Sequence, residues 1–492
     1  MSIATDVSPP AEASPDRPAA TGRTWSIVPL LTRLHFYGGI LVAPLLATAA
    51  LTGLLFAFTP QLDGLVYDRE LHVEQVGPGL PKPLSEQVAA AIAAHPGGTL
   101  ASVLPAAAPD ATTRVVFSVP ELGEQQHTVY VDPYTGEVRG QLTTWFGETP
   151  LMTWLDDLHT GLHLGETGTL YSETAASWLW VLVLGGLILW CNRQWQRRAD
   201  TRRGRGRVDA TVFYDLKAAK GVRRTRGFHA ATGVWLVVGL LFLSATGLTW
   251  STYAGGNFSA ALDRLDARRP ALDTSLTGGA APAATAHHGA APAAGAADPA
   301  QVDAVLHIAR EHGISGPMEL YPPADANSAW SVVENDNVWP VHFDKLAVDP
   351  VAGTVVHRTD YADWPFLAKL SALGIQAHMG YLFGLANQLL LAALAVGLLC
   401  VIVWGYRMWW QRRPTRAGRR AVVGPPPARG AWRRLRLPLL IAGVLATAAI
   451  GWALPAFGVT LLAFLVLDTA AGLVRRRRRK PPVPTSPAPA GA

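Results

Sequence analysis

Long uninterrupted apolar runs constrain this chain more than any other feature. Runs of about 18–25 apolar residues are long enough to cross about 30 Å of hydrocarbon as a helix. They occur near 35–59, 175–192, 230–252 and 384–406, and a further apolar block covers 437–474. Of the 492 residues, 49% are hydrophobic, and 17 are tryptophan, a composition that excludes an ordinary soluble enzyme. The sequence predicts a multi-pass protein of the cytoplasmic membrane.

Arginine clusters predict how the spans are oriented. The loop 193–226 and the segment 407–436 are both rich in arginine. By the positive-inside rule they are cytoplasmic, which places 60–174 and 253–383 outside the cytoplasm. Because the clusters alternate with the spans, they indicate topology, and we expect no nucleic-acid partner. No apolar signal region precedes the first span, so that span is expected to stay in the membrane as an anchor. Arg23 and Arg33 precede most of it, which predicts a cytoplasmic N-terminus.

The C-terminal apolar block 437–474 is too long for one straight span, which needs only about 20 residues. Basic residues flank it on both sides, including "RRRRRK" at 475–480. Two short spans that turn near Pro455 keep both flanks in the cytoplasm, because proline interrupts a helix. The block contains no histidine, so we expect an accessory hairpin, a total of six spans and a cytoplasmic C-terminus.

The first half of the chain resembles the second. Three pairs of segments match: 33–65 with 226–265, 158–165 with 377–384, and 190–195 with 404–409. The matches align His35 with His229 and His159 with His378, whereas His163 falls opposite Leu382. Both copies cross the membrane in the same sense. The repeat predicts a mainly α membrane protein whose four-helix core is a tandem parallel repeat.

Each copy encloses an outer insert of roughly 100 residues that reads as a small α+β domain. Helices are predicted at 84–95 and 299–313. Strands are predicted at 113–119, 127–142, 330–335 and 339–358, with turns at "DPYTGE" and "DPVAGT". An Ala/Gly/Pro tract at 271–298 is predicted to be a disordered linker.

The full predicted organisation follows from these signals. In chain order it comprises a disordered cytoplasmic tail (1–24), span 1 (25–60), a first outer domain (61–158), an outer histidine motif with span 2 (159–195), a basic loop (196–226), span 3 (227–253), a second outer domain (254–370), a second histidine motif with span 4 (371–410), a basic loop (411–436), the hairpin (437–474) and a basic, Pro-rich tail (475–492).

The outer domains and the spans together resemble a known family. A helix-plus-sheet domain closing on "VYVDPYTGEV", set between spans that carry "LHxxxG" and "HaatGvW…ATGL", resembles the PepSY-associated transmembrane family. That family includes iron-regulated membrane proteins and ferric-siderophore reductases of the bacterial inner membrane. The resemblance covers roughly residues 25–413. It implies PepSY-like outer domains, haem b in the bundle and electron transfer to an extracytoplasmic acceptor.

Five histidines at span ends are the candidate cofactor-binding residues: His35 and His229 inside, and His159, His163 and His378 outside. Bis-imidazole ligation of haem iron needs two neutral histidines facing each other at one depth. Repeat-equivalent histidines would lie at one depth on neighbouring helices, so the two matched pairs are the expected ligands of the two haems that the resemblance implies, with His163 as a spare ligand or a partner of the ligand. Helical spacing would place His163 on the same face as His159.

Glycines near the histidines fit a flat macrocycle. Gly39 and Gly233 each follow an inner histidine by four residues, Gly38 follows His35 by three, and Gly161 and Gly380 each follow an outer histidine by two. A porphyrin packed on a helix needs positions without side chains. Close packing of helices would explain such glycines equally well.

Two other interpretations remain open from the residues alone. Asp157 or Glu166 could join His159 and His163 in a zinc site, although this leaves the inner histidines unexplained. The chain could also be a non-redox PepSY membrane protein that binds peptide or cell-wall ligands.

No catalytic side chains and no built-in electron donor are predicted. The chain has no Gly-rich nucleotide motif after a strand, and its two cysteines cannot hold an iron–sulfur cluster. We therefore expect a membrane oxidoreductase that takes electrons from a separate reductase or from reduced flavin. It would pass them to an acceptor such as a ferric siderophore.

Overall fold

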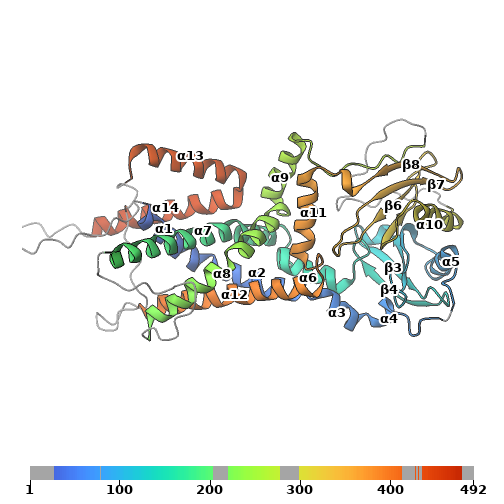
Figure 1. The fold of residues 1–492 in the computed structure, drawn as a ribbon, viewed down its shortest axis with the longest axis horizontal. Coiled ribbons are helices and arrows are strands. Elements are labelled where there is room, and N and C mark those ends of the chain that lie inside the picture. Colours follow the sequence, from blue (N-terminus) through green and yellow to red (C-terminus); the bar gives the residue numbers. More distant parts are fainter. Residues whose placement is uncertain are drawn as a thin grey trace, which may run out of the picture.

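The computed structural model describes residues 27–77, 79–202, 220–276, 298–412, 427, 430 and 435–478. A bundle of long helices forms one end of the molecule and a β-sheet with short helices forms the other (Figure 1). The predicted N-terminal tail, positions 277–297 of the predicted linker and most of the basic loops lie outside the described residues.

Four described helices are long and apolar enough to cross a membrane. They are α7 (Glu166–Arg202), α8 (Val222–Thr249), α12 (Leu385–Gln411) and α14 (Pro455–Arg478). Three of them correspond to the predicted spans 2, 3 and 4. The prediction of a mainly helical membrane protein that also carries an antiparallel sheet is confirmed.

The first predicted span is broken into α1 (Val28–Leu41) and α2 (Ala43–Phe56), which are bent by 56°. Pro44 causes the break because it has no N–H to donate to the carbonyl of Ile40. That carbonyl instead accepts a hydrogen bond from the hydroxyl of Tyr406, at 2.9 Å. A neighbouring helix thus satisfies the polar group that the bend leaves free.

The spans pack in a ring in which α7 contacts α8, α8 contacts α12, α12 contacts α2, and α1 contacts α7. Between α8 and α12, Leu394 lies against Gly239 and Leu236 lies against Gly397. Each leucine therefore occupies the space left by a glycine on the facing helix, as expected where helices pack closely in a membrane.

The strands of both predicted outer domains form a single antiparallel sheet in the order β4-β3-β2-β1-β5-β6-β7-β8. The strands are β1 (Thr99–Leu104), β2 (Thr113–Ser118), β3 (Gln126–Val131), β4 (Val138–Thr144), β5 (Met318–Tyr321), β6 (Trp330–Glu334), β7 (Lys345–Asp349) and β8 (Thr354–Thr359). The two halves join where Val103 of β1 pairs with Leu320 of β5. Neither of these two strands is predicted by the sequence.

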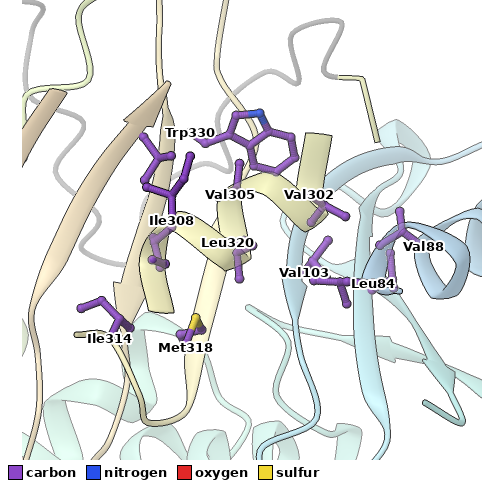
Figure 2. Packing of buried hydrophobic residues seen from close by; sticks show 14 of the residues in the cluster. Leu84, Val88, Val103, Val302, Val305, Ile308, Ile314, Met318, Leu320 and Trp330 are labelled. Atoms are coloured by element: carbon purple, nitrogen blue, oxygen red, sulfur yellow. The ribbon is translucent and has the colours of Figure 1, made fainter. Parts of the chain in front are cut away.

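One hydrophobic core supports the joined sheet. It lies between the sheet and the helices α5 (Leu84–Ala94) and α10 (Val302–Glu311), both of which the sequence predicts. Val88, Val305 and Trp330 are among its buried members (Figure 2). Because both halves contribute to this core, the joined sheet and its two helices form one packed unit at the end of the bundle (Figure 1).

The two predicted turns share one local mechanism. In "DPYTGE" the Asp132 carboxylate accepts backbone N–H groups from Tyr134 and Thr135. In "DPVAGT" the Asp349 carboxylate does the same for Val351 and Ala352. These Asx-type bonds fix both hairpin turns.

Shorter helices connect the sheet to the bundle. They are α3 (Thr59–Val66), α4 (Asp68–Leu71), α6 (Pro150–Gly161), α9 (Thr252–Arg264) and α11 (Phe366–Met379), with 3-10 turns at Pro120–Leu122, Pro299–Gln301 and Tyr361–Asp363. Helix α13 (Leu437–Ala453) precedes α14, and the break between them falls at Leu454, directly before Pro455. The predicted break at this proline is confirmed.

Candidate functional site

The end of the bundle farther from the sheet holds two histidines that face each other. His35 of α1 and His229 of α8 have ring centroids 6.2 Å apart, with an interplanar angle of 80°. Two imidazoles on opposite sides of one metal ion, each with a metal–nitrogen distance of about 2 Å, have centroids about 6 Å apart. We call these two residues the sheet-distal pair.

The surroundings of the sheet-distal pair leave room for the rings and orient one of them. His229 Nδ1 lies 2.9 Å from the carbonyl of Val401 on α12 and donates to it. His35 Nδ1 is buried, and the His35 ring lies near the carbonyl of Leu182. A Cβ at Gly186 would lie 3.1 Å from the His35 ring, and one at Gly405 would lie 3.8 Å from the His229 ring.

A second pair lies at the end of the bundle nearest the sheet. His159 is in the last turn of α6 and His378 is in the last turn of α11. Their ring centroids are 6.5 Å apart, with an interplanar angle of 51°. This spacing also suits two ligands of one metal ion. We call these residues the sheet-proximal pair.

Two threonines hold the sheet-proximal rings. His159 Nδ1 lies 2.9 Å from the Thr52 hydroxyl, and His378 Nδ1 lies 2.6 Å from the Thr246 hydroxyl. Each hydroxyl donates to a carbonyl one turn earlier in its own helix, at 2.9 Å for Thr52 and 2.8 Å for Thr246. Each therefore accepts the N–H of the histidine, which leaves the Nε2 lone pair available for a metal.

Burial keeps the sheet-proximal pair neutral. Helices α6 and α11 lie outside the candidate spans. Desolvation lowers the pKa of His159 to about 4. Desolvation, and then the neighbouring charge of His159, lowers the pKa of His378 to about 3. Both imidazoles are therefore neutral at pH 7, as metal ligation requires.

Sequence reasoning missed the two threonines, although the signal was present. Thr52 and Thr246 belong to the matched "TGL" segments and follow His35 and His229 at the same spacing. The glycine after each threonine also faces an imidazole. A Cβ at Gly53 would lie 2.9 Å from the ring of His159, and one at Gly247 would lie 3.6 Å from that of His378. The motif thus supplies both a hydrogen-bond acceptor and space for the ring.

The glycines singled out in the sequence have different surroundings. Beta carbons at Gly39 and Gly233 would meet nothing within 4 Å, so both face open space one turn after their histidines. Gly38 instead packs against Trp178 and Leu182. Gly380 ends α11 at a φ of 92°, where a side chain would be strained.

The contacts revise one detail of the repeat. Gly186 and Gly405 face the two sheet-distal rings and are separated by the same number of residues as His159 and His378. An ungapped alignment of α7 with α12 therefore fits these contacts. It places Arg193 opposite Arg412, whereas the match of 190–195 with 404–409 places Arg193 opposite Arg407.

The expectation that His163 shares a helix face with His159 is wrong. Helix α6 ends at Gly161, and both Leu162 and His163 adopt left-handed backbone conformations, with φ of 53° and 55°. The His163 ring turns away from the pair. Its Nδ1 bonds the Asp157 carboxylate at 2.6 Å, and the ring lies against Trp154, with centroids 4.9 Å apart.

The described residues contain no group of three or more His, Cys, Asp or Glu side chains that could hold a metal ion. A protein zinc site takes three or four protein ligands, so the zinc interpretation has no support in this part of the chain. Haem iron needs only two axial protein ligands, because the macrocycle supplies the other four nitrogens. Two isolated pairs of histidines suit that requirement.

Fold and site together define a multi-pass helical membrane protein whose antiparallel sheet overlies a bundle with a histidine pair at each end. The chain belongs to the PepSY-associated TM region family, whose family model matches residues 32–412. The match includes both histidine pairs and the whole sheet, and it confirms the resemblance seen in the sequence. The curated proteins include no match to this chain.

Proposed function

We propose that this protein carries haem b and transfers electrons across the membrane to an extracytoplasmic acceptor. The observation that supports this function best is the presence of two facing histidine pairs, with centroids 6.2 and 6.5 Å apart. His35 and His229 would hold one haem, and His159 and His378 would hold the other. Haem bound in this way supplies one-electron exchange at its iron.

The positions of the pairs support transfer across the bilayer. Helix α8 contributes to both sites, with His229 near its start and Thr246 near its end. At a rise of 1.5 Å per residue, these two positions are about 25 Å apart along the helix. The hydrocarbon core is about 30 Å thick, so the two sites would lie near its opposite boundaries.

The side chains of this protein have defined tasks in that function. The Val401 carbonyl and the Thr52 and Thr246 hydroxyls hold three of the rings in the tautomer whose Nε2 can bind a metal. Facing glycines keep space for the rings, and the apolar bundle around Leu46, Leu179 and Leu240 excludes water. No side chain is required to form a covalent intermediate.

The charge pattern supports an orientation for this transfer. The sheet would be extracytoplasmic and the Arg-rich loops cytoplasmic. A separate reductase or reduced flavin would donate the electrons, and a ferric siderophore is the proposed acceptor on the basis of the family resemblance. We expect a reporter fused after Ala492 to read cytoplasmic. An external reading would mean that 437–474 crosses the membrane once.

An absorption spectrum tests the redox proposal directly. Protein purified in detergent from cells with ample haem should show the low-spin spectrum of b-type haem with two imidazole ligands. Addition of dithionite should reduce the iron and produce the sharp absorption bands of the reduced haem. Colourless protein of the correct fold would rule out this function. The non-redox alternative, a PepSY protein that binds peptide or cell-wall ligands, would then be favoured.

The threonine hydroxyls provide a milder test. Thr246→Val keeps the shape of the side chain but removes the acceptor for His378 Nδ1. Loss of such a partner typically costs 10–100-fold in metal affinity. We therefore expect faster loss of the sheet-proximal haem to a haem-scavenging apoprotein. Thr249→Val, one turn along the same helix face, is the control, because Thr249 donates only to the Thr246 carbonyl. Equal loss rates in the two variants would contradict the role of Thr246.

A further inference from the structure

A pocket of about 750 Å³ lies between the start of α8 and the end of α12, and one of its lining residues, Phe228, directly precedes His229 of the sheet-distal pair. Its lining comes from the start of α8 and the end of α12: Lys220, Gly221, Arg224, Thr225, Phe228, Trp404 and Arg407. The volume falls within the usual range for small-molecule sites, about 300–1,000 Å³. The family match assigns no role to it.

The pocket has an aromatic wall next to the histidine site. The rings of Phe228 and Trp404 have centroids 5.6 Å apart and lie at 30° to each other. Phe228 directly precedes His229, and Trp404 directly precedes Gly405, which faces the His229 ring. A planar ligand against this wall would be close to the sheet-distal pair.

Three side chains of the lining are cationic. They are Lys220, Arg224 and Arg407, and no acidic residue is among the described residues that line the pocket. Within the described chain none of these three forms an ion pair, although Arg224 lies over the Phe228 ring at 5.5 Å. Three cations without acidic partners on one small pocket indicate an anionic ligand.

The start of α8 adds to this preference. The helix begins at Val222, and its N-cap residue, Gly221, makes no side-chain capping bond. Among the described residues no side chain caps the first N–H groups of the helix, and the positive end of the helix dipole favours an anion such as phosphate. The helix end therefore adds to the preference for an anion that the cationic side chains create.

The bundle itself does not require these residues. In the ungapped alignment of α7 with α12, the positions that match Trp404 and Arg407 are Gly185 and Ile188, and those that match Arg224 and Phe228 at the spacing of His35 and His229 are Leu30 and Leu34. The charges and aromatic rings thus occur in one half only, although both halves contribute to the histidine pairs. The pocket is therefore a specific feature of the second half.

We propose that this pocket binds the reduced flavin nucleotide that supplies electrons to the sheet-distal site, with its phosphate on the cations and its ring system on Phe228 and Trp404. This inference rests on the proposed function. A dihydroflavin gives up two electrons, one at a time, and two protons, so one molecule converts two ferric irons to ferrous and becomes oxidised flavin. Nicotinamide donors transfer hydride, an electron pair, and so do not suit a one-electron acceptor. A neutral quinol would leave the three cations without a partner.

Binding of the flavin nucleotide can be measured with its oxidised form, which transfers no electrons to the protein. Oxidised flavin mononucleotide is titrated into the purified full-length protein, and quenching of flavin fluorescence gives the Kd. We expect saturable binding, and binding of riboflavin, which lacks the phosphate, to be at least tenfold weaker. Arg407→Gln should weaken nucleotide binding about tenfold, as expected for loss of one charge-assisted contact. Phe228→Leu should weaken binding of the nucleotide and riboflavin alike.

The control is Arg223→Gln, because Arg223 neighbours Arg224, is exposed and does not line the pocket. Its Kd should match that of the unmodified protein. Equal affinity for riboflavin and the nucleotide, or equal weakening in Arg223→Gln and Arg407→Gln, would overturn the proposal. Displacement of the nucleotide by phosphatidylglycerol in nanodiscs, but not by inorganic phosphate, would instead identify a lipid headgroup site.

The haem spectrum is recorded for each variant. A coloured protein that binds no flavin nucleotide would refute this inference and leave the proposed electron transfer intact. A colourless protein would refute the proposed function, whether or not nucleotide binds.

Discussion

His378→Ala is expected to lower the haem content from two per chain to one. The variant removes one member of the sheet-proximal pair and leaves the sheet-distal pair unchanged, and a single imidazole cannot maintain the bis-histidine site. The haem-to-protein ratio from the pyridine haemochromogen assay measures the loss. His229→Ala should have the same effect on the other site, and the double variant should be colourless.

His163→Ala is the matched control for the sheet-proximal site. His163 follows His159 by four residues, but its ring bonds Asp157 and lies against Trp154, away from the pair. The variant should keep two haems per chain and an unchanged spectrum. Loss of a haem in His163→Ala together with retention of both in His159→Ala would show that the pairs are assigned wrongly.

The sequence predicted the histidine pairs because a repeat carries information about contacts between distant segments. Matching His35 with His229 predicts that the two lie at equal depth on helices related by the repeat, and the structure brings their ring centroids to 6.2 Å. The same reasoning applies to His159 and His378. The matched "TGL" segments carried a further signal, because any residue repeated at a fixed distance from a ligand is a candidate partner of a ligand.

Other features depended on contacts that a single segment does not encode. The bend at Pro44 is tolerated because Tyr406, far along the chain, donates to the freed carbonyl of Ile40. The pairing of strands β1 and β5 through Val103 and Leu320 is visible only once both halves are folded. The two outer domains were predicted separately, and their union in one sheet was not.

The position of His163 shows a different limit. The spacing of four residues indicates a shared helix face only if the helix continues, and here it ends at Gly161. The spacing of the two histidines does not reveal that Leu162 and His163, after Gly161, leave the helix in a left-handed conformation. The role of His163 as a haem partner thus had a weaker basis than the repeat.

The C-terminal hairpin has closer ties to the bundle than its lack of histidines suggested. The Phe457 ring of α14 lies against Trp178 of α7, with centroids 5.2 Å apart. Trp178 Nε1 also donates to the Thr460 hydroxyl at 2.8 Å. The hairpin therefore contributes packing to the core even though it supplies no candidate ligand.

An ion pair makes this contribution testable. Arg33 is only 6% exposed, and one terminal nitrogen of its guanidinium is paired with the Asp468 carboxylate of α14, while the other terminal nitrogen donates to the Pro427 carbonyl. Asp468→Ala would leave a buried arginine without its counter-charge. Breaking a buried pair in this way costs about 3–5 kcal/mol, because the remaining charge is uncompensated. We expect a clear fall in the melting temperature of the protein in detergent.

A double variant that replaces both partners distinguishes two contributions to stability: the cost of leaving Arg33 without a counter-charge, and the net stabilisation from the ion pair itself. Arg33→Met combined with Asp468→Leu should melt within a few degrees of the unmodified protein, since apolar replacement of a buried pair is often neutral or stabilising. Because Arg33 is two residues before His35 and is not a ligand, both haems should remain bound in Asp468→Ala at low temperature. If that variant melted normally, α14 would not be coupled to the first span. If Asp468→Ala lost the sheet-distal haem even at low temperature, the hairpin would be required to form the histidine site, and its predicted accessory role would be wrong.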